Sequence, residues 1–264
     1  MGNFLEISQV SKAYFSIDEK TEIAVVSPLS LSISRGEIVM FLGPSGCGKT
    51  TLMRIIGGLE SQDNGTIILD GQILAGPDRR RGMVFQSYSS FPWLNVRENI
   101  KFGTRYRKDL SAREKDEITN HYMEMVGLSK YRKFYTNKIS GGMKQRVAIA
   151  RTLASSPDIL LMDEPFGALD AQTRENLQFQ LMEINKKEKK TTIFVTHDVE
   201  EAILLADRIF IFSARPAKIL KEIDVNIEIQ TDDRRARTAD MNKFFSLRTE
   251  ILEIVRAEYS QTFG

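Results

Sequence analysis

The stretch "GPSGCGKTT" at residues 43–51 constrains the fold more than any other part of this chain. It follows the nearly continuous apolar run 37–42 and precedes 49–59, where apolar residues recur at helical spacing. Gly43, Gly48, Lys49 and Thr50 fit the pattern G-x-x-x-x-G-K-[ST], which is meaningful only between a strand and a helix. The sequence therefore predicts a strand, a tight loop and a helix in succession.

The residue types of this loop suit a ligand that carries several negative oxygens. Glycines let backbone N–H groups turn toward phosphate oxygens, and the helix N-terminus adds positive potential. We expect Lys49 to reach the β- and γ-phosphates and Thr50 to give its hydroxyl to Mg²⁺. Cys47 is either a redox-sensitive thiol or, as we favour, a small residue that permits close approach of the phosphates. The predicted nucleotide contacts are Gly43, Pro44, Ser45, Gly46, Cys47, Gly48, Lys49, Thr50 and Thr51.

Composition excludes several classes of function. The 264 residues carry 37 basic and 35 acidic side chains, a net charge of +2, which argues against a broad basic face for nucleic acid. A single cysteine excludes an internal disulfide and favours a reducing compartment. The first ten residues do not resemble a secretory signal. No stretch approaches the ~20 apolar residues that span a bilayer, so we expect any membrane role to act through a partner.

Strands and helices alternate along most of the chain, which predicts an α/β fold with a largely parallel sheet. A change to charged helices occurs from about residue 95 to 154, and Ser111 with Glu114 forms a predicted capping box there. Asp198 and Glu201 are predicted as a second capping pair. We expect strands at 4–10, 22–26, 29–34, 37–42, 65–71, 82–86, 158–165, 191–197 and 208–216.

A polar stretch at 231–240 separates the last predicted strand region from an amphipathic helix. Leu247, Ile251 and Ile254 or Val255 lie on one stripe of that helix. We interpret it as a helix docked on its own domain, with a regulatory element or a dimer contact as the alternative. The predicted domains are 1–230, with a helical subdomain at about 87–155, and a C-terminal helical extension at 231–264.

Two carboxylates follow the apolar run "ILLM" at residues 159–162. The carboxyl end of a buried strand is where open α/β sheets bind ligands. Asp163 is therefore predicted to orient Mg²⁺, largely through water, and Glu164 to polarise an attacking water. Without the loop at 43–51, two solvated acids at a strand end would be the better interpretation.

Between these motifs, "ISGGMKQR" at residues 139–146 is similar to the LSGGQ-type signature of ATP-binding cassette (ABC) transporter ATPases. Gln86 resembles the Q-loop glutamine of that family, and "GALD" at 167–170 resembles its D-loop. His197 resembles the switch histidine, and Tyr14 resembles the aromatic that stacks on adenine, although the adjacent Phe15 competes for that role. The resemblance covers about residues 4 to 225. Ile139 and Met143 depart from the usual leucine and glutamine.

The resemblance implies the fold, the reaction and the partners. The fold is a P-loop NTPase of the ABC ATPase type, with a mostly parallel core sheet, an antiparallel β subdomain and a helical subdomain. It implies ATP and Mg²⁺, with Glu164, His197 and Gln86 catalytic, and Thr50, Gln86 and Asp163 near the metal. Two copies are expected to form a dimer in which Ser140, Gly141, Gly142 and Asp170 of one copy close on the ATP of the other.

The segment "FPWL" at residues 91–94 follows the Q-loop and contains the only tryptophan. In the family this region receives a coupling helix of the membrane subunit, so Phe91, Pro92, Trp93 and Leu94 are candidates to line the groove; a core position is the alternative. "PWLNV" and "DEPFGALDAQTR" look most like the ATPases of nitrate, sulfonate, taurine and bicarbonate importers. We therefore expect permease subunits as partners, an extracytoplasmic solute-binding protein as an indirect one, and a peripheral position on the cytoplasmic face of the membrane.

Three other functions compete with an importer subunit. A soluble ABC ATPase that acts on DNA, ribosomes or protein assembly should carry two cassettes or a long coiled-coil insertion, and this chain has neither. A non-catalytic scaffold should have lost Glu164, Lys49 or His197, and all three are present. An exporter half would usually be fused to its membrane segment.

Overall fold

The computed structural model describes residues 3–16, 18, 20–86, 89–167, 169–227 and 240–263. The chain divides into two compact units, one formed by Met1–Pro77 with Thr191–Gly264 and the other by Asp78–Lys190. All but the last residue of the predicted link at 231–240, and the predicted boundaries at 87 and 230, lie outside the described residues. The domain boundaries proposed from the sequence therefore stay a prediction.

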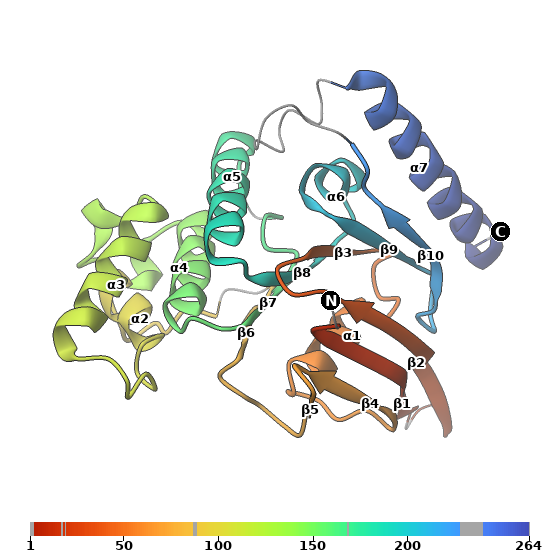
Figure 1. Cartoon of the computed structure of the whole chain (residues 1–264), viewed down its shortest axis with the longest axis horizontal. Coiled ribbons are helices and arrows are strands. Elements are labelled where there is room, and N and C mark those ends of the chain that lie inside the picture. Colours follow the sequence, from red (N-terminus) through yellow and green to blue (C-terminus); the bar gives the residue numbers. More distant parts are fainter. Residues whose placement is uncertain are drawn as a thin grey trace. The chain divides into compact units, whose positions relative to one another are not determined.

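The first unit contains an antiparallel sheet and a mostly parallel one (Figure 1). The antiparallel sheet has the order β2-β1-β4-β5. In the second sheet β3 pairs in parallel with both β8 and β9, and β10 joins β9 antiparallel. The antiparallel sheet consists of β1 (Leu5–Ser16), β2 (Thr21–Ile33), β4 (Asn64–Leu69) and β5 (Gln72–Ile73). The strands that this unit gives to the second sheet are β3 (Ile38–Leu42), β8 (Thr191–Thr196), β9 (Arg208–Phe212) and β10 (Ile219–Asp224).

Three helices belong to this unit: α1 (Lys49–Ile56), α6 (Val199–Leu205) and α7 (Met241–Phe263). Helix α7 packs on α6, which is the docked arrangement favoured from the sequence. Ile251 is fully buried on the predicted stripe, whereas Leu247 is only half-buried. Arg248 and Glu200 form an ion pair between the two helices, with Nε and Oε1 2.8 Å apart.

The second unit contains β6 (Arg81–Val84) and β7 (Ile159–Asp163), which pair in parallel. Its helices are α2 (Val96–Phe102), α3 (Ala112–Met125), α4 (Gly141–Ala154) and α5 (Ala171–Glu188), with short 3₁₀ turns at Ser129–Tyr131 and Thr136–Lys138. Helices α2, α3 and α4 pack on one another. The capping box of Ser111 and Glu114 is confirmed at the start of α3. Parallel strands, an antiparallel sheet and a helical group confirm the predicted fold class.

Two local predictions from the sequence were wrong. The segments 22–26 and 29–34 are not separate strands but form the single strand β2, whose proline lies at an edge of the sheet, where a missing N–H is tolerated. Asp198 and Glu201 are not a reciprocal pair. Asp198 accepts from the Glu200 and Glu201 N–H groups, but the Glu201 carboxylate instead accepts from the Thr196 hydroxyl at 2.5 Å.

Among the described residues, no helix combines the length and the hydropathy that a bilayer span requires.

Candidate active site

The loop at 43–51 has the strand–loop–helix geometry that the motif predicts. Strand β3 ends at Leu42 and α1 begins at Lys49, with Gly48 as its N-cap. A Cβ on Gly48 would lie 2.5 Å from the Val25 carbonyl oxygen, and its φ of +120° is unfavourable for any other residue. A Cβ on Gly43 would lie 2.8 Å from the Phe212 carbonyl oxygen. Both glycines are therefore required by the close approach of neighbouring backbone.

Lys49 folds back on the loop that precedes it. Its side chain is buried, and Nζ donates to the carbonyl oxygens of Gly43 at 2.8 Å and Pro44 at 2.6 Å, and to Cys47 Sγ at 3.5 Å. An ammonium has three N–H donors, so the loop itself occupies all of them. To bind a phosphate, Lys49 must exchange at least one of these contacts for a phosphate oxygen.

Cys47 is 1% exposed, and its thiol points toward Lys49 rather than toward solvent. A redox sensor needs an accessible thiolate. The structure therefore favours the interpretation of Cys47 as a small buried residue in the loop. Ser45 and Gly46, in contrast, are exposed at the tip of the loop, and Gly46 has a φ of +76°.

His197 lies at the same sheet edge as the loop. Leu42 at the end of β3 pairs with Thr196 at the end of β8, so Gly43 and His197 leave adjacent parallel strands in the same direction. The His197 side chain is exposed there. The turn that carries it is held by Thr196, whose hydroxyl accepts from the Asp198 N–H at 3.1 Å. His197 and the loop thus share the sheet edge at which open α/β sheets bind ligands, and the contact of His197 with the γ-phosphate stays a prediction.

Tyr14 lies near the end of β1, where it pairs with Ile23. Its ring is 40% exposed, its hydroxyl donates to the Glu60 carboxylate, and the Lys12 ammonium lies 5.4 Å from the ring centre. Burial raises the pKa of Glu60. The ring of Phe15 is more exposed, at 65%, and has no such anchor. A tethered ring is the better platform for stacking, because less side-chain entropy is lost when a base binds.

In the second unit, Gln86 and Glu164 contact each other. Val84 and Met162 are paired in the ladder of β6 and β7. Gln86 lies two positions after Val84, and Glu164 lies two positions after Met162. Gln86 Nε2 donates to Glu164 Oε2 at 2.7 Å. Glu164 has a φ of +44°, in the left-handed region that few non-glycine residues adopt. Such strain is concentrated at functional sites, where it fixes the direction of a side chain.

The predicted metal ligands fit Mg²⁺ by their chemistry. A hydroxyl from Thr50, an amide oxygen from Gln86 and a carboxylate from Asp163 are all hard oxygen donors. Asp163 is the last residue of β7 and is 4% exposed. Because Gln86 uses its amide nitrogen on Glu164, its carbonyl oxygen is the atom that would serve the metal. Among the described residues, no group of three or more histidines, cysteines or carboxylates is arranged so that it could hold a metal ion.

The signature forms the start of helix α4. Ser140 is the N-cap, and its hydroxyl accepts from the Met143 N–H at 3.3 Å. Gly141 and Gly142 are the first two helical residues, so their N–H groups belong to the set that an α-helix leaves unpaired at its N-terminus. The helix start at the signature is therefore present, and its binding of an anion stays a prediction.

Asp170 of the predicted D-loop is the N-cap of α5. Its carboxylate accepts from the Thr173 N–H at 3.0 Å, and that hydrogen bond lowers the Asp170 pKa, with a smaller contribution from Arg146. The side chain is exposed. Residue 168 of the D-loop lies outside the described residues.

The aromatic segment, residues 91–94, connects the Gln86 region to α2. Trp93 is 69% exposed, and its ring centre lies 5.4 Å from that of Phe91. Pro92 is exposed, and Leu94 is half-buried. The alternative interpretation of Trp93 as a core residue was therefore wrong: its ring lies at the surface of its unit.

Two residues that support this segment were missed from the sequence. Asn99 is fully buried; its amide accepts from the Phe91 N–H at 2.8 Å and donates to the Phe91, Leu94 and Asn95 carbonyls. Arg151 contacts Ser89 and the ring of Phe91. The available signals were a polar residue between Val96 and Ile100 on a helix, and an arginine inside the apolar run 147–154.

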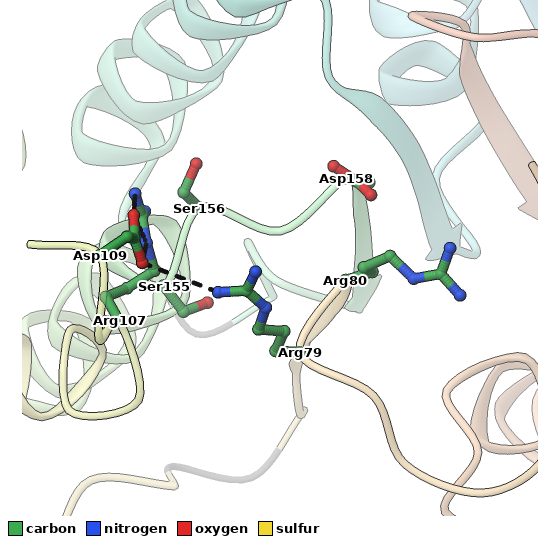
Figure 2. Close-up of a pocket in the computed structure, with 7 residues that line it drawn as sticks. All are labelled: Arg79, Arg80, Arg107, Asp109, Ser155, Ser156 and Asp158. Carbon is green, nitrogen blue, oxygen red and sulfur yellow. Dashed lines mark hydrogen bonds and ion pairs between the residues drawn. The ribbon is translucent and has the colours of Figure 1, made fainter.

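The second unit also contains a cavity of about 270 Å³, shown in Figure 2. It lies apart from the contact of Gln86 with Glu164. It adjoins Arg80 and Asp158, which precede β6 and β7, whereas Gln86 and Glu164 follow the opposite ends of these strands. Arg107 is held by Asp109 with its Nη2 at 2.7 Å, and Figure 2 shows Arg80 pointing away from that pair. The cavity is lined by Arg79, Arg80, Arg107, Asp109, Ser155, Ser156 and Asp158. Because acids offset much of its basic charge, we assign it no part in nucleotide binding.

Comparisons with known proteins place the chain in a family. The ABC transporter family matches residues 26–167. The chain is 40% identical over 260 residues, 97% of each chain, to the nitrate import ATP-binding protein NrtD of Synechocystis sp. (strain ATCC 27184 / PCC 6803 / Kazusa). It is 43% identical over 251 residues, 94% of each chain, to the aliphatic sulfonates import ATP-binding protein SsuB of Bacillus thuringiensis subsp. konkukian (strain 97-27).

A solved dimeric structure of the ATP-binding cassette MJ0796, in a post-hydrolysis state with ADP and Pi, matches with a TM-score of 0.76. The match has 32% sequence identity and covers 84% of this chain and 99% of that one. The loop, the signature and the pair of Gln86 and Glu164 thus occur in a fold shared with a nucleotide-bound cassette. The chain belongs to the ABC transporter family, as one of its ATP-binding proteins.

Proposed function

We propose that this chain is the ATP-hydrolysing subunit of a membrane importer for a small anion such as nitrate, a sulfonate, taurine or bicarbonate. The relatives named above carry nitrate and sulfonate import in their names, and they align over nearly the whole chain. The observation that carries the proposal is the contact of Gln86 with Glu164. This contact joins the proposed hydrolytic carboxylate, Glu164, to Gln86, and the chain continues from Gln86 to the aromatic segment.

In this mechanism the loop at 43–51 wraps the phosphates of ATP with its N–H groups, and Lys49 moves from the loop carbonyls to the β- and γ-phosphates. Tyr14 stacks on the adenine. Glu164 accepts a proton from the attacking water and orients it for in-line attack on the γ-phosphorus. His197 contacts the γ-phosphate from the neighbouring strand end, and the pairing of Leu42 with Thr196 supports this role.

Mg²⁺ bound by Thr50, Gln86 and, largely through water, Asp163 would neutralise charge on the β- and γ-phosphate oxygens. The protein's own contribution is positional. The ladder of β6 and β7 sets the spacing of Gln86 and Glu164, and the left-handed backbone at Glu164 directs its side chain.

Two copies complete each other's sites in this proposal. Ser140, Gly141 and Gly142 of one copy cap the γ-phosphate held by the loop of the other, and Asp170 lies beside that interface. The solved cassette at 32% identity is dimeric with ADP and Pi, which supports this arrangement. A two-fold axis repeats the contact, so one dimer closes on two ATP molecules.

The aromatic segment is the proposed docking site for the permease subunits, which would hold the chain on the cytoplasmic face of the membrane. Pro92 and Trp93 are exposed and Phe91 and Leu94 are half-buried, so the segment offers an apolar surface around the tryptophan. Trp is enriched at the buried centres of protein interfaces. An extracytoplasmic solute-binding protein would act only indirectly, through the permease. A soluble ABC ATPase not coupled to transport is the second candidate, because the same catalytic residues would serve it.

The proposal is tested by reconstitution with a permease and a solute-binding protein whose genes neighbour the gene of this chain. Proteoliposomes that contain all three proteins should take up one of nitrate, taurine, an alkanesulfonate or bicarbonate only with ATP and Mg²⁺. Lys49→Ala should abolish both hydrolysis and uptake. Trp93→Ala should lower uptake and permease association but not the hydrolysis of the isolated chain. If the permease neither binds this chain nor changes its rate of ATP hydrolysis, the uncoupled ATPase is favoured instead.

A further inference from the structure

Arg151 on helix α4 is a half-buried cation whose hydrogen-bond partners are all neutral. Its Nη1 donates to the Ser89 carbonyl at 2.7 Å and its Nη2 to the Ser89 hydroxyl at 2.8 Å. The guanidinium carbon lies 4.7 Å from the centre of the Phe91 ring. Within the described part of the chain the structure gives Arg151 no ion pair, and burial lowers its pKa. A guanidinium nevertheless stays charged at neutral pH, so its partial burial without a carboxylate partner costs free energy, and we look for a role that explains it.

The groups that Arg151 holds lead directly to the surface of the aromatic segment. The Phe91 ring that it covers lies 4.7 Å from the ring of Phe102 and 5.4 Å from that of Trp93. The backbone of the segment is held by the buried amide of Asn99, which contacts both the N–H and the carbonyl of Phe91. The Thr136 hydroxyl donates to that same carbonyl at 3.2 Å. Because these contacts fix both the backbone and the ring of Phe91, we expect a displacement of Phe91 to displace the rest of the aromatic segment.

The other end of the same helix carries the signature. Helix α4 runs unbroken from Gly141 to Ala154, and Ser140 caps it. Arg151 is eleven residues beyond Ser140, which at 1.5 Å per residue is roughly 16 Å along the axis. A helix of this length moves as a body, because its hydrogen bonds are internal. A shift of the signature therefore displaces the guanidinium and, through it, Ser89 and Phe91.

We infer that Arg151 is a positioning residue that links the signature end of α4 to the aromatic segment, so that engagement of Ser140 with ATP changes the surface that Trp93 presents. The inference rests on the proposed function only in that ATP brings a partner copy to the signature. The planar fork of arginine matters here. It binds the carbonyl and the hydroxyl of Ser89 at once while its face covers an aromatic ring, which a lysine ammonium cannot do.

Trp93 is the only tryptophan of the chain, so its fluorescence reports on the aromatic segment alone. The experiment uses the full chain with Glu164→Gln, which retains ATP, and compares emission and acrylamide quenching of Trp93 with and without ATP and Mg²⁺. The parent chain should show an ATP-dependent shift in emission or quenching. Arg151→Lys should still bind ATP and dimerise by size exclusion, but should lose most of the Trp93 response.

A matched control lies on the same helix. Arg146 also donates to a backbone carbonyl, that of Val126 at 2.8 Å, but it contacts no residue of the aromatic segment. Arg146→Lys should keep the Trp93 response, even where it lowers the thermal midpoint as much as Arg151→Lys does. Ser89→Ala removes only the hydroxyl contact, so it should reduce the response partially and serves as the second variant if Arg151→Lys fails to fold.

Two outcomes would overturn the inference. One is an Arg151→Lys chain that dimerises with ATP and keeps the full Trp93 response. The other is a parent chain that forms the ATP dimer without any change at Trp93. Neither touches the proposed function, which fails instead if the chain without substitutions does not hydrolyse ATP and the parent forms no ATP dimer.

Discussion

The Gln86 amide donates a 2.7 Å hydrogen bond to Glu164 Oε2, from one parallel strand end to its neighbour. The contact orders both side chains, because the hydrogen bond restricts the rotamers that each of them can adopt. It also ties the conformation of the Gln86 backbone to the orientation of the hydrolytic carboxylate. A change transmitted along the chain to Gln86 therefore reaches Glu164 through one hydrogen bond.

Glu164→Gln should leave ATP binding intact and slow hydrolysis by about 10²- to 10⁴-fold, the usual effect of removing a positioned base. The replacement is nearly isosteric, but it no longer accepts a proton from water. The variant should also accumulate as an ATP-bound dimer, measured by size exclusion with ATP and Mg²⁺. Steady-state turnover near that of the parent chain would remove Glu164 from the catalytic role.

The sequence predicted the loop, the signature and the strand ends because glycine spacing and apolar runs are local features. Gly48 is one example: its spacing predicted a tight turn, and the structure adds that the Val25 carbonyl approaches it. Asn99 and Arg151 could not be predicted in this way. Their contacts join residues 8 and 62 positions apart, and a single sequence gives no sign of which buried carbonyl a polar side chain reaches.

The same limit explains the errors in local structure. Glu201 has the spacing of a capping partner for Asp198, but its carboxylate accepts from the Thr196 hydroxyl, and the Asp198 N–H donates to that same hydroxyl. Segments 22–26 and 29–34 looked like two strands because a proline separates their patterns. Their common pairing with β1 joins them into one strand, since tertiary pairing overrides a local break.

Gly48→Ala should lower the free energy of unfolding by about 2 kcal/mol or more, because the methyl group meets a backbone oxygen and the φ of +120° is strained. Gly71→Ala is the matched control: its φ is +75°, but nothing lies within 4 Å of an added Cβ. It should cost only about 1 kcal/mol. Urea unfolding measures both, and equal losses would show that the contact with Val25 is relieved without cost.

Tyr14→Ala should weaken ATP binding by about 5- to 150-fold, which corresponds to about 1–3 kcal/mol for stacking on a base. Phe15→Ala should leave the affinity nearly unchanged, since its ring has no anchor such as Glu60. Titration with a fluorescent ATP analogue measures both variants. A larger loss from Phe15→Ala than from Tyr14→Ala would assign the adenine contact to Phe15.

The composite site predicts rescue between two inactive variants. Ser140→Arg places a bulky cation at the start of α4, and Lys49→Ala removes the phosphate ligand of the loop; each homodimer then has a lesion in every site. A mixed dimer has one site in which an intact Lys49 faces an intact signature, and one site that carries both lesions. Mixing the two chains should therefore restore ATP hydrolysis, to less than half of the unmodified level if the two sites must act together.

The test requires that subunits exchange, so it is best done with the permease present. The two chains of each mixture carry different affinity tags, so that mixed dimers are isolated through both tags and assayed free of either homodimer. A double variant that carries Ser140→Arg and Lys49→Ala in one chain, mixed with the unmodified chain, is the control. It contains the same lesions, but it leaves each mixed site with exactly one of them and should show no rescue. If each chain had a self-contained site, this control mixture would keep one intact site and the first mixture none. The two mixtures thus give opposite results, and activity in the control pair without activity in the first would reject the two-subunit site.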